Sequence, residues 1–158
     1  MFLISSNACF ALPDDREKKL QLSADHADLN QQTRHGEFIG NVQLDQGSTH
    51  LRAAKAVTEG DEQNRLSLAI AKGQGKDQAH YWTLTALSKP PLHAYADTIR
   101  YYPSRHLIEL IGNARVSQGD NSFTAPQIRY DTVKQHVLSE GKGESRTTII
   151  IHPGKQKK

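Results

Sequence analysis

The chain has 158 residues, of which 36% are hydrophobic and 23% charged, with a formal net charge of +3. This length suits one domain with a real core, and no apolar run is long enough to span a bilayer. Lys155, Lys157 and Lys158 account for the net charge. The rest of the chain is formally neutral and lacks the basic patch that a nucleic-acid partner requires, so no such partner is expected.

The N-terminal segment differs from everything after it. Residues 1–11 combine apolar and small side chains and end at Ala11, which predicts a truncated secretory signal peptide. The alternative is an apolar tail with no targeting role. Residues 12–19 are charged and aperiodic and predict a leader. Removal of the signal would also remove Cys9, the only cysteine, so neither disulfides nor a cysteine-based metal site or nucleophile is expected.

Alternating apolar and polar residues predict a series of strands in a single domain at residues 20–152. The elements predicted in its first half begin with a strand at 18–24 and a second strand with its turn at 27–33. A hairpin at 36–59 that reverses at 46–48, a polar loop at 59–64 and a strand at 65–70 follow. Nowhere is there an apolar stripe with helical spacing over ten or more residues. The predicted fold class is therefore all-β.

The hairpin sequence occurs as an internal repeat, and its two copies align at a fixed offset without a gap. Between residues 22–59 and 94–131, nine of 38 positions are identical, including Gly40-Asn41, which recurs as Gly112-Asn113. A self-match at a fixed period indicates a repeated supersecondary unit. A glycine inside an alternating strand predicts a bulge, a bend or a close approach of other atoms to the backbone.

The remaining segments complete the predicted order of elements. Residues 77–93 break the repeat, hold the only tryptophan and end at Pro90-Pro91. The stretch 136–143 echoes the strand at 65–75 at a slightly shorter offset, and β-branched residues at 147–151 predict a last strand. The lysine-rich tail at 153–158 is expected to be disordered.

One apolar face per strand follows from this alternation. It could form either a closed sandwich core or an open apolar interior, because both use the same residues. The face comprises Leu20, Leu22, Phe38, Val42, Leu44, Leu51, Leu66, Leu68, Ile70, Ile99, Tyr101, Leu110, Val116, Phe123, Ile128 and Tyr130.

No catalytic or metal site is predicted. The eight histidines are scattered, without the paired spacing of metal ligands, and the sequence contains no nucleophile elbow, P-loop or dinucleotide fingerprint. Asp25 and Asp97 recur as a carboxylate pair that could be imagined in a glycosidase. As symmetry-related copies they are better explained as caps of equivalent turns, and no cofactor is expected.

The ordered pieces of both repeats resemble the OstA-like family over about residues 18–152. The matching pieces are Ser23-Ala24-Asp25, Phe38-x-Gly40-Asn41-Val42, Gln46-Gly47, Gly73-x-Gly75-Lys76, His93-x-x-Ala96, Tyr101, Leu110-x-Gly112-Asn113-Ala114 and Ile128-x-Tyr130. The resemblance implies a folded-over antiparallel β-jellyroll, also called a β-taco, that is open at its edges.

The resemblance also implies a periplasmic role in lipopolysaccharide transport. Lipid A acyl chains would lie inside the fold, carried from the inner to the outer membrane, and the sugars would stay outside. On this basis the lipid-binding groove comprises the apolar face given above without Leu66. The charged residues Lys55, Lys72 and Arg105 are candidates for contacts with lipid A phosphates. The alternatives are a related envelope module of the same fold and a glycan-active enzyme on a repeated β scaffold.

The unpaired ends of such a sheet predict docking by strand addition. Inner-membrane and outer-membrane transport proteins would be the partners, and head-to-tail self-association would give short filaments. The alternative is that Lys18, Lys19 and Arg146 block the edges. The predicted docking residues are Leu20, Gln21, Leu22, Thr148, Ile149 and Ile150.

Overall fold

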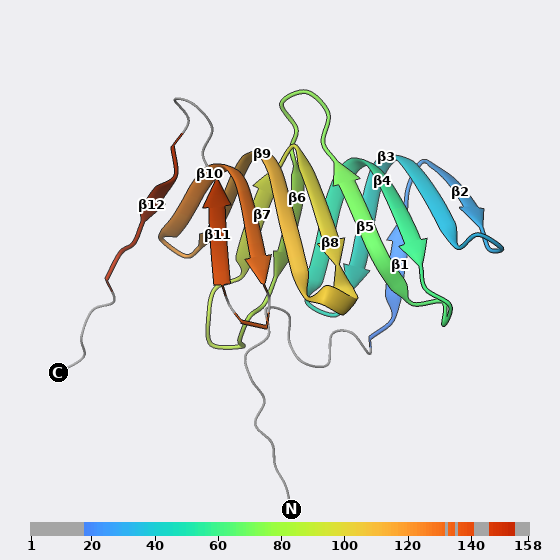
Figure 1. The fold of residues 1–158 in the computed structure, drawn as a ribbon, viewed down its shortest axis with the longest axis horizontal. Coiled ribbons are helices and arrows are strands. Elements are labelled where there is room, and N and C mark those ends of the chain that lie inside the picture. The colour runs from blue at the N-terminus through green and yellow to red at the C-terminus, as the bar shows by residue number, and fades with distance from the viewer. Residues whose placement is uncertain (1–17, 132, 135, 141–145, 154–158) are drawn as a thin grey trace, which may run out of the picture.

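The computed structural model describes residues 18–131, 133–134, 136–140 and 146–153, and these residues form twelve strands and a short 3₁₀ helix (Figure 1). The signal peptide, most of the leader and most of the tail predicted above lie outside the described residues, as do Gly141 and Gly143. The elements are β1 (Leu20–Ser23), β2 (His26–Asn30), β3 (His35–Gln46), β4 (Thr49–Gly60), β5 (Leu66–Lys72), β6 (Ala79–Thr83), β7 (Leu92–Ala96), β8 (Thr98–Tyr102), η2 (Pro103–Arg105), β9 (Leu107–Gln118), β10 (Asn121–Asp131), β11 (His136–Glu140) and β12 (Thr148–Ile150).

Four long strands, β3, β4, β9 and β10, each run through two layers. One half of each long strand lies in the first sheet, where β3 pairs with β2, β4 with β5, β9 with β8 and β10 with β11. The other half lies in the second sheet, where β3 pairs with β1, β4 with β6, β9 with β7 and β10 with β12. All of these pairings are antiparallel, and the two layers lie one in front of the other in Figure 1. The all-β, folded-over jellyroll predicted from the sequence is confirmed.

The long strands cross between the sheets at bends made by the repeated glycines. Gly40 has a φ of 85° and Asn41 one of 48°, while Gly112 and Asn113 have φ values of 86° and 48°. Pairing with the neighbouring strand shifts register at both places. Such a positive φ is accessible to glycine at little cost and strains any residue with a Cβ, which explains why glycine occupies both positions.

An aspartate holds each bend from the adjoining corner of the chain. The backbone N–H of Asp25 donates to the carbonyl of Gly40 over 2.8 Å, and the Asn41 amide donates to the Asp25 carboxylate over 3.0 Å. Asp97 makes the same two contacts at the second bend, over 2.9 and 3.1 Å. The carboxylate pair thus has a structural role at two separate, equivalent corners.

Six of the strands form a closed circuit of pairings around the line of bends. In order they are β4, β5, β8, β9, β7 and β6, and the last returns to β4. Strands β1 and β2 lie at one end of the molecule and β11 and β12 at the other (Figure 1). Among the described residues, each of these four terminal strands is paired on one side only.

Leu68 and Ile70 do not line the interior, so the sequence prediction is wrong for these two residues. On β5 the residues that reach the core are Ala69 and Ala71, which are 2% and 0% exposed. Leu68 and Ile70 lie on the opposite face of the strand and are half-buried there.

A β-bulge at the start of β5 explains the error. Gly60 pairs with Leu66 whereas Glu59 pairs with Leu68, so Ser67 is an extra residue in the ladder. Because side chains alternate with a period of two, one extra residue moves every following side chain to the other face. Leu66 therefore faces inward, although it was not included in the predicted groove.

A channel between the two sheets

The middle of the interior is filled by the protein's own side chains. The residues that pack there are small or branched and come from both sheets, so the layers approach closely along the line of bends. Val42, Ile99, Leu110 and Ile128 are at most 1% exposed, and the alanines at 71, 79, 96 and 114 are fully buried. All four large residues were predicted to face inward; Ile99, Leu110 and Ile128 lie in this packed region, and Val42 packs in a smaller cluster with Phe38 and Ala56.

At the N-terminal end the interior is open. A cavity of about 620 Å³ lies between β1, β2, β3 and the facing ends of β4 and β5, and its lining is predominantly apolar. Leu20, at 42% exposed, and Leu29, at 60%, lie at its entrance. The apolar part of the lining comprises Leu20, Leu22, Leu29, Phe38, Leu44 and Leu66.

A second cavity, of about 470 Å³, opens along the seam where the strand ends of the two sheets face each other. It spans from Leu20 and Gln46 on the second sheet to Leu66 and Tyr101 on the first sheet, and it reaches the 3₁₀ helix at Pro103. Both cavities share Leu20, Asn64, Arg65 and Leu66. Together they form one apolar passage open at an end and along a side, which we call the channel.

Cationic and polar side chains surround the mouth of the channel. Arg34 and Arg65 contribute to the lining of the end cavity, and the Nε of Arg34 is buried without a hydrogen-bond partner. Arg65 Nε donates to Asp61 over 3.1 Å. Hydrogen bonds from the Arg65 and Gln63 backbone N–H groups, with help from the Arg65 side chain, hold the pKa of Asp61 below its usual value.

The three cations suggested by the sequence are placed differently. Lys55 of β4 and Lys72 of β5 are directly opposite each other in the strand ladder, next to the bends. They lie on the face opposite the buried Ala56 and Ala71. They therefore do not border the channel. Arg105 lies in η2 beside the seam, with its guanidinium carbon 5.1 Å from the centre of the Tyr102 ring.

The other predicted groove residues lie on the inner face. Leu20, Leu22, Phe38 and Leu44 line the end cavity and Tyr101 lines the seam. Leu51 and Tyr130 are buried in or beside the core, and Val116 and Phe123 are partly buried against it. Of the predicted docking residues, Leu20, Gln21 and Leu22 lie in β1 and Thr148, Ile149 and Ile150 in β12, at opposite ends of the molecule.

A row of stacked rings on the outer face of the second sheet was not foreseen. His80 stacks on Trp82 at a centroid distance of 4.5 Å and on Tyr95 at 4.2 Å, and its Nε2 lies 2.9 Å from Nδ1 of His93. Burial, the neighbouring His93 and Arg52 lower the pKa of His80 to about 4. Alternation along β6 could have indicated this row, since His80 and Trp82 flank the inward-facing Tyr81 and therefore share the outer face.

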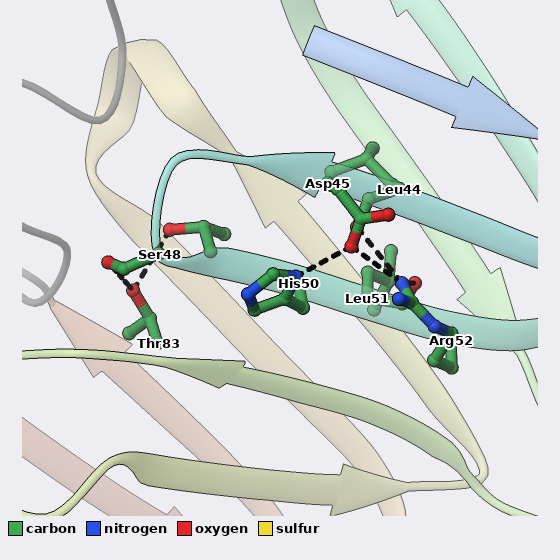
Figure 2. A network of polar contacts seen from close by, with 8 residues as sticks. Leu44, Asp45, Ser48, His50, Leu51, Arg52 and Thr83 are labelled. Atoms are coloured by element: carbon green, nitrogen blue, oxygen red, sulfur yellow. Dashed lines mark hydrogen bonds and ion pairs between the residues drawn. The ribbon is translucent and has the colours of Figure 1, made fainter. Parts of the chain in front are cut away.

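Next to this row, Asp45 anchors two side chains of β4 (Figure 2). Its Oδ1 lies 2.6 Å from His50 Nδ1 and accepts a hydrogen bond from Arg52 Nη1 over 2.9 Å. Partial burial acts to raise the pKa of Asp45, but the hydrogen bonds and charges of His50 and Arg52 outweigh it and lower the pKa. Arg52 in turn lies over the Trp82 ring, so this polar network stabilises the outer face.

Within the described ranges, no three histidine, cysteine, aspartate or glutamate side chains are grouped so that they could hold a metal ion. A search of the same residues finds no helix with the length and apolarity of a membrane span. The lining of the channel is mainly apolar, so its chemistry is that of a binding surface for apolar chains.

Comparison with known proteins identifies close parallels to this architecture. The family model for LptA and the N-terminal domain of LptD, LPS transport proteins, matches residues 21–136. The lipopolysaccharide export system protein LptH of Pseudomonas aeruginosa is 29% identical over 97% of this chain and 90% of its own length. LptA of Escherichia coli is 26% identical, over 94% of this chain and 80% of its own.

The fold comparison agrees with the sequence comparison. The crystal structure of LptH, described as the LptA-homologous periplasmic component of the lipopolysaccharide transport device of Pseudomonas aeruginosa, superposes with a TM-score of 0.80. The two chains are 28% identical in that alignment, which covers 89% of this chain and all of the LptH chain.

Proposed function

The chain belongs to the family of LptA and the LptD N-terminal domain, and from this premise we propose that it is a periplasmic lipopolysaccharide-binding bridge protein. It carries lipopolysaccharide from the inner toward the outer membrane, with the acyl chains of lipid A inside the channel and the sugars outside. It acts by binding and transfer, without catalysis.

The observation that supports this role is an apolar channel that is open at an end and along the seam. Each methylene group removed from water contributes about 0.8 kcal/mol, so a lipid with several acyl chains needs apolar shelter and little polar recognition. Arg34 and Arg65 at the mouth, beside the acidic Glu59 and Asp61, supply guanidinium donors suited to the phosphates of lipid A. An open seam lets the sugars remain in water while the acyl chains move along the interior.

Passage beyond the N-terminal half requires the sheets to part. Ile99, Leu110 and Ile128 fill the middle of the interior and are at most 1% exposed. An acyl chain that moves past them must displace these side chains, and the seam is the side on which the two sheets can separate. The channel seen at the N-terminal end is thus the part of the groove that is open without this separation.

The terminal strands provide the docking sites of the bridge. Strands β1 and β2 at one end and β11 and β12 at the other each have a side unpaired within the described residues. Inner-membrane and outer-membrane lipopolysaccharide transport proteins add strands there, and copies of the chain join head to tail. Each addition continues both the sheets and the apolar interior.

Competition for bound lipopolysaccharide tests this function. Labelled lipopolysaccharide bound to the purified protein is expected to be displaced by lipid A, because the acyl chains supply the binding free energy. The saccharide from deacylated lipopolysaccharide is expected to leave roughly 90% or more of the label bound at the same concentration, by an order-of-magnitude argument from methylene burial. Displacement by the saccharide alone, or hydrolysis of a glycan panel by the protein, would contradict the proposal.

A further inference from the structure

We propose that the junction between the two repeats is the template for docking a second copy of the chain, and that Arg146 of one copy binds Asp25 of the next. This inference rests on the proposed head-to-tail assembly and assigns its strand register and a residue pair that recognises the partner. It follows from the repeat itself, because the chain already contains one joint between two copies of the same unit.

Two strand pairs make the internal joint. On the first sheet β5 pairs with β8, and Ile70 lies opposite Arg100. On the second sheet β6 pairs with β7, and Tyr81 lies opposite Ala94. Both pairings are antiparallel, so the joint continues each sheet without a break.

The four terminal strands are the unpaired equivalents of these four. The alignment of the two repeats, which sets Gly112 on Gly40, places β7 on β1 and β8 on β2. The strands β11 and β12 take the places of β5 and β6 beside β10. Gln127 pairs with Glu140 as Lys55 pairs with Lys72. Phe123 pairs with Ile149 as Leu51 pairs with Tyr81. The alignment of β11 with β5 and the alignment of β12 with β6 therefore have the same offset in residue number.

Transferring the internal register to the ends assigns the register of the docked strands. On the first sheet, β11 of one copy pairs with β2 of the next, and Leu138 lies opposite Asp28. On the second sheet, β12 pairs with β1, and Ile149 lies opposite Leu22. Ile149 then extends the inner row that contains Leu22, Leu44 and Leu51, so the apolar interior runs on into the second copy.

The exposed apolar residues support a second copy as the occupant of these edges. Of the nine large apolar side chains that are exposed among the described residues, six lie on or directly beside the terminal strands, and Ile39, Leu87 and Val133 lie elsewhere. Those at the N-terminal end are Leu20 and Leu29, and those at the C-terminal end are Leu138, Ile149, Ile150 and Ile151. In the assigned register Ile149 lies opposite Leu22, and the same offset sets Ile151 opposite Leu20, so apolar residues of the two ends meet on the second sheet.

The recognising pair follows from one contact of the internal joint. Gln78 Nε2 donates to Asp97 Oδ1 over 3.3 Å and to the carbonyl of Asn113 over 2.9 Å, so it ties the β5–β6 corner to the bend of the second repeat. The alignment that sets Glu140 on Lys72 and Ile149 on Tyr81 puts Arg146 in the place of Gln78. The alignment of the two repeats puts Asp25 in the place of Asp97.

At the docked joint, a charged guanidinium donor therefore takes the place of the neutral amide donor of Gln78. Asp25 already accepts the Asn41 amide through one carboxylate oxygen, Oδ2, and the geometry of Asp97 shows that the other oxygen faces the incoming corner. A guanidinium at this position can form a charge-assisted hydrogen bond to the carboxylate. A second polar pair lies nearby, because the assigned register sets the Glu140 carboxylate opposite the His26 imidazole of the second copy.

Disulfide trapping tests the register. In a Cys9→Ser background, chains carrying Leu138→Cys are mixed with chains carrying Asp28→Cys and oxidised; a cross-linked dimer is expected, because directly opposed residues have Cβ atoms about 5 Å apart. The matched controls replace Ala27 or Leu29 with cysteine instead, which moves the thiol to the other face of β2. More cross-linking by a control than by the Asp28 variant would overturn the register.

Charge substitutions test the recognising pair by measuring the dissociation constant of self-association. Arg146→Glu is expected to weaken association about tenfold. Arg146→Gln, which places at position 146 the residue type of Gln78, is expected to retain association but to make the dissociation constant less dependent on salt. In a double-mutant cycle, Asp25→Asn is expected to have little further effect once Arg146→Gln is present. Wild-type association by Arg146→Glu, or fully additive effects in the cycle, would overturn the pair.

Lipopolysaccharide binding is measured on the same variants to separate the two proposals. The Arg146 and Leu138 variants are expected to bind lipopolysaccharide as the unaltered chain does, since these two residues lie at the opposite end from the channel mouth. Association in another register with intact lipid binding would overturn this inference and leave the proposed function standing. Loss of lipid binding by the unaltered chain would instead remove the proposed function.

Discussion

The Leu66→Glu variant is expected to bind lipopolysaccharide about a hundredfold more weakly than the unaltered protein, whereas Leu68→Glu is expected to bind it normally. Leu66 lines both cavities of the channel, so the carboxylate of a glutamate introduced there would have to lose water against an acyl chain. Leu68 lies on the other face of the same strand, on the far side of the bulge at Ser67. The two substitutions are chemically identical and differ only in the face on which they fall.

Titration of each purified variant with fluorescent lipid A measures this difference, and urea denaturation checks that both are folded. Both leucines are half-buried, so a glutamate at either position can remain hydrated in the unliganded protein. Equal loss of binding by the two variants would contradict the assigned face of β5. Normal binding by Leu66→Glu would show that the acyl chains lie somewhere other than the channel.

The Gly112→Ala variant is expected to lose about 2–4 kcal/mol of unfolding free energy. Gly112 has a φ of 86°, and a Cβ added there would lie 2.5 Å from the Asp97 carboxylate oxygen and 3.0 Å from its Cβ and Cγ. Asp97 cannot withdraw freely, since its backbone N–H and its carboxylate both bond to the bend. The substitution therefore combines backbone strain with the displacement of the residue that holds the corner.

Gly75→Ala provides the matched control for this prediction. Gly75 has a φ of 59°, and nothing lies within 4 Å of its added Cβ, so only the backbone cost of about 1–2 kcal/mol is expected. Equilibrium urea denaturation of both variants gives the comparison. If Gly112→Ala were no less stable than Gly75→Ala, the contact between Asp97 and the bend would not be what holds the two sheets at this corner.

The repeat and its bends could be predicted because they rest on local chemistry. Gly40 and Gly112 interrupt alternating strands, and a glycine in that setting indicates a bend whichever strand lies beside it. The recurrence of Asp25 as Asp97 pointed to equivalent turns, and the two carboxylates do hold equivalent corners. Strand positions followed from alternation in the same way, because burial on one face imposes a period of two on each strand by itself.

The face of β5 could not be predicted, because a bulge depends on the partner strand. Ser67 carries no local signal that it is the extra residue, and the shift appears only when Gly60 and Glu59 are placed beside it. The row of rings formed by His80, Trp82 and His93 was missed for a similar reason. Their spacing along the chain excludes a paired motif, and only the pairing of β6 with β7 brings them together.

The cations at the channel mouth were also out of reach of sequence reasoning. Arg34 and Arg65 belong to separate turns that are distant in the chain, and they meet only because β3 and β4 form a hairpin whose open end lies against the start of β5. Lys55 and Lys72 carry the same charge, yet they lie on strands β4 and β5 and face away from the channel. Charge alone does not tell these cases apart without the fold.

Photo-crosslinking to lipopolysaccharide tests the central claim most directly. A photoreactive residue in place of Phe38, in the end cavity, or Tyr101, at the seam, is expected to capture lipopolysaccharide, whereas one in place of Asn41 or Asn113, at the bends, is expected to capture none. Equal capture at all four positions, or capture at the bends alone, would contradict the account of acyl chains held between the sheets.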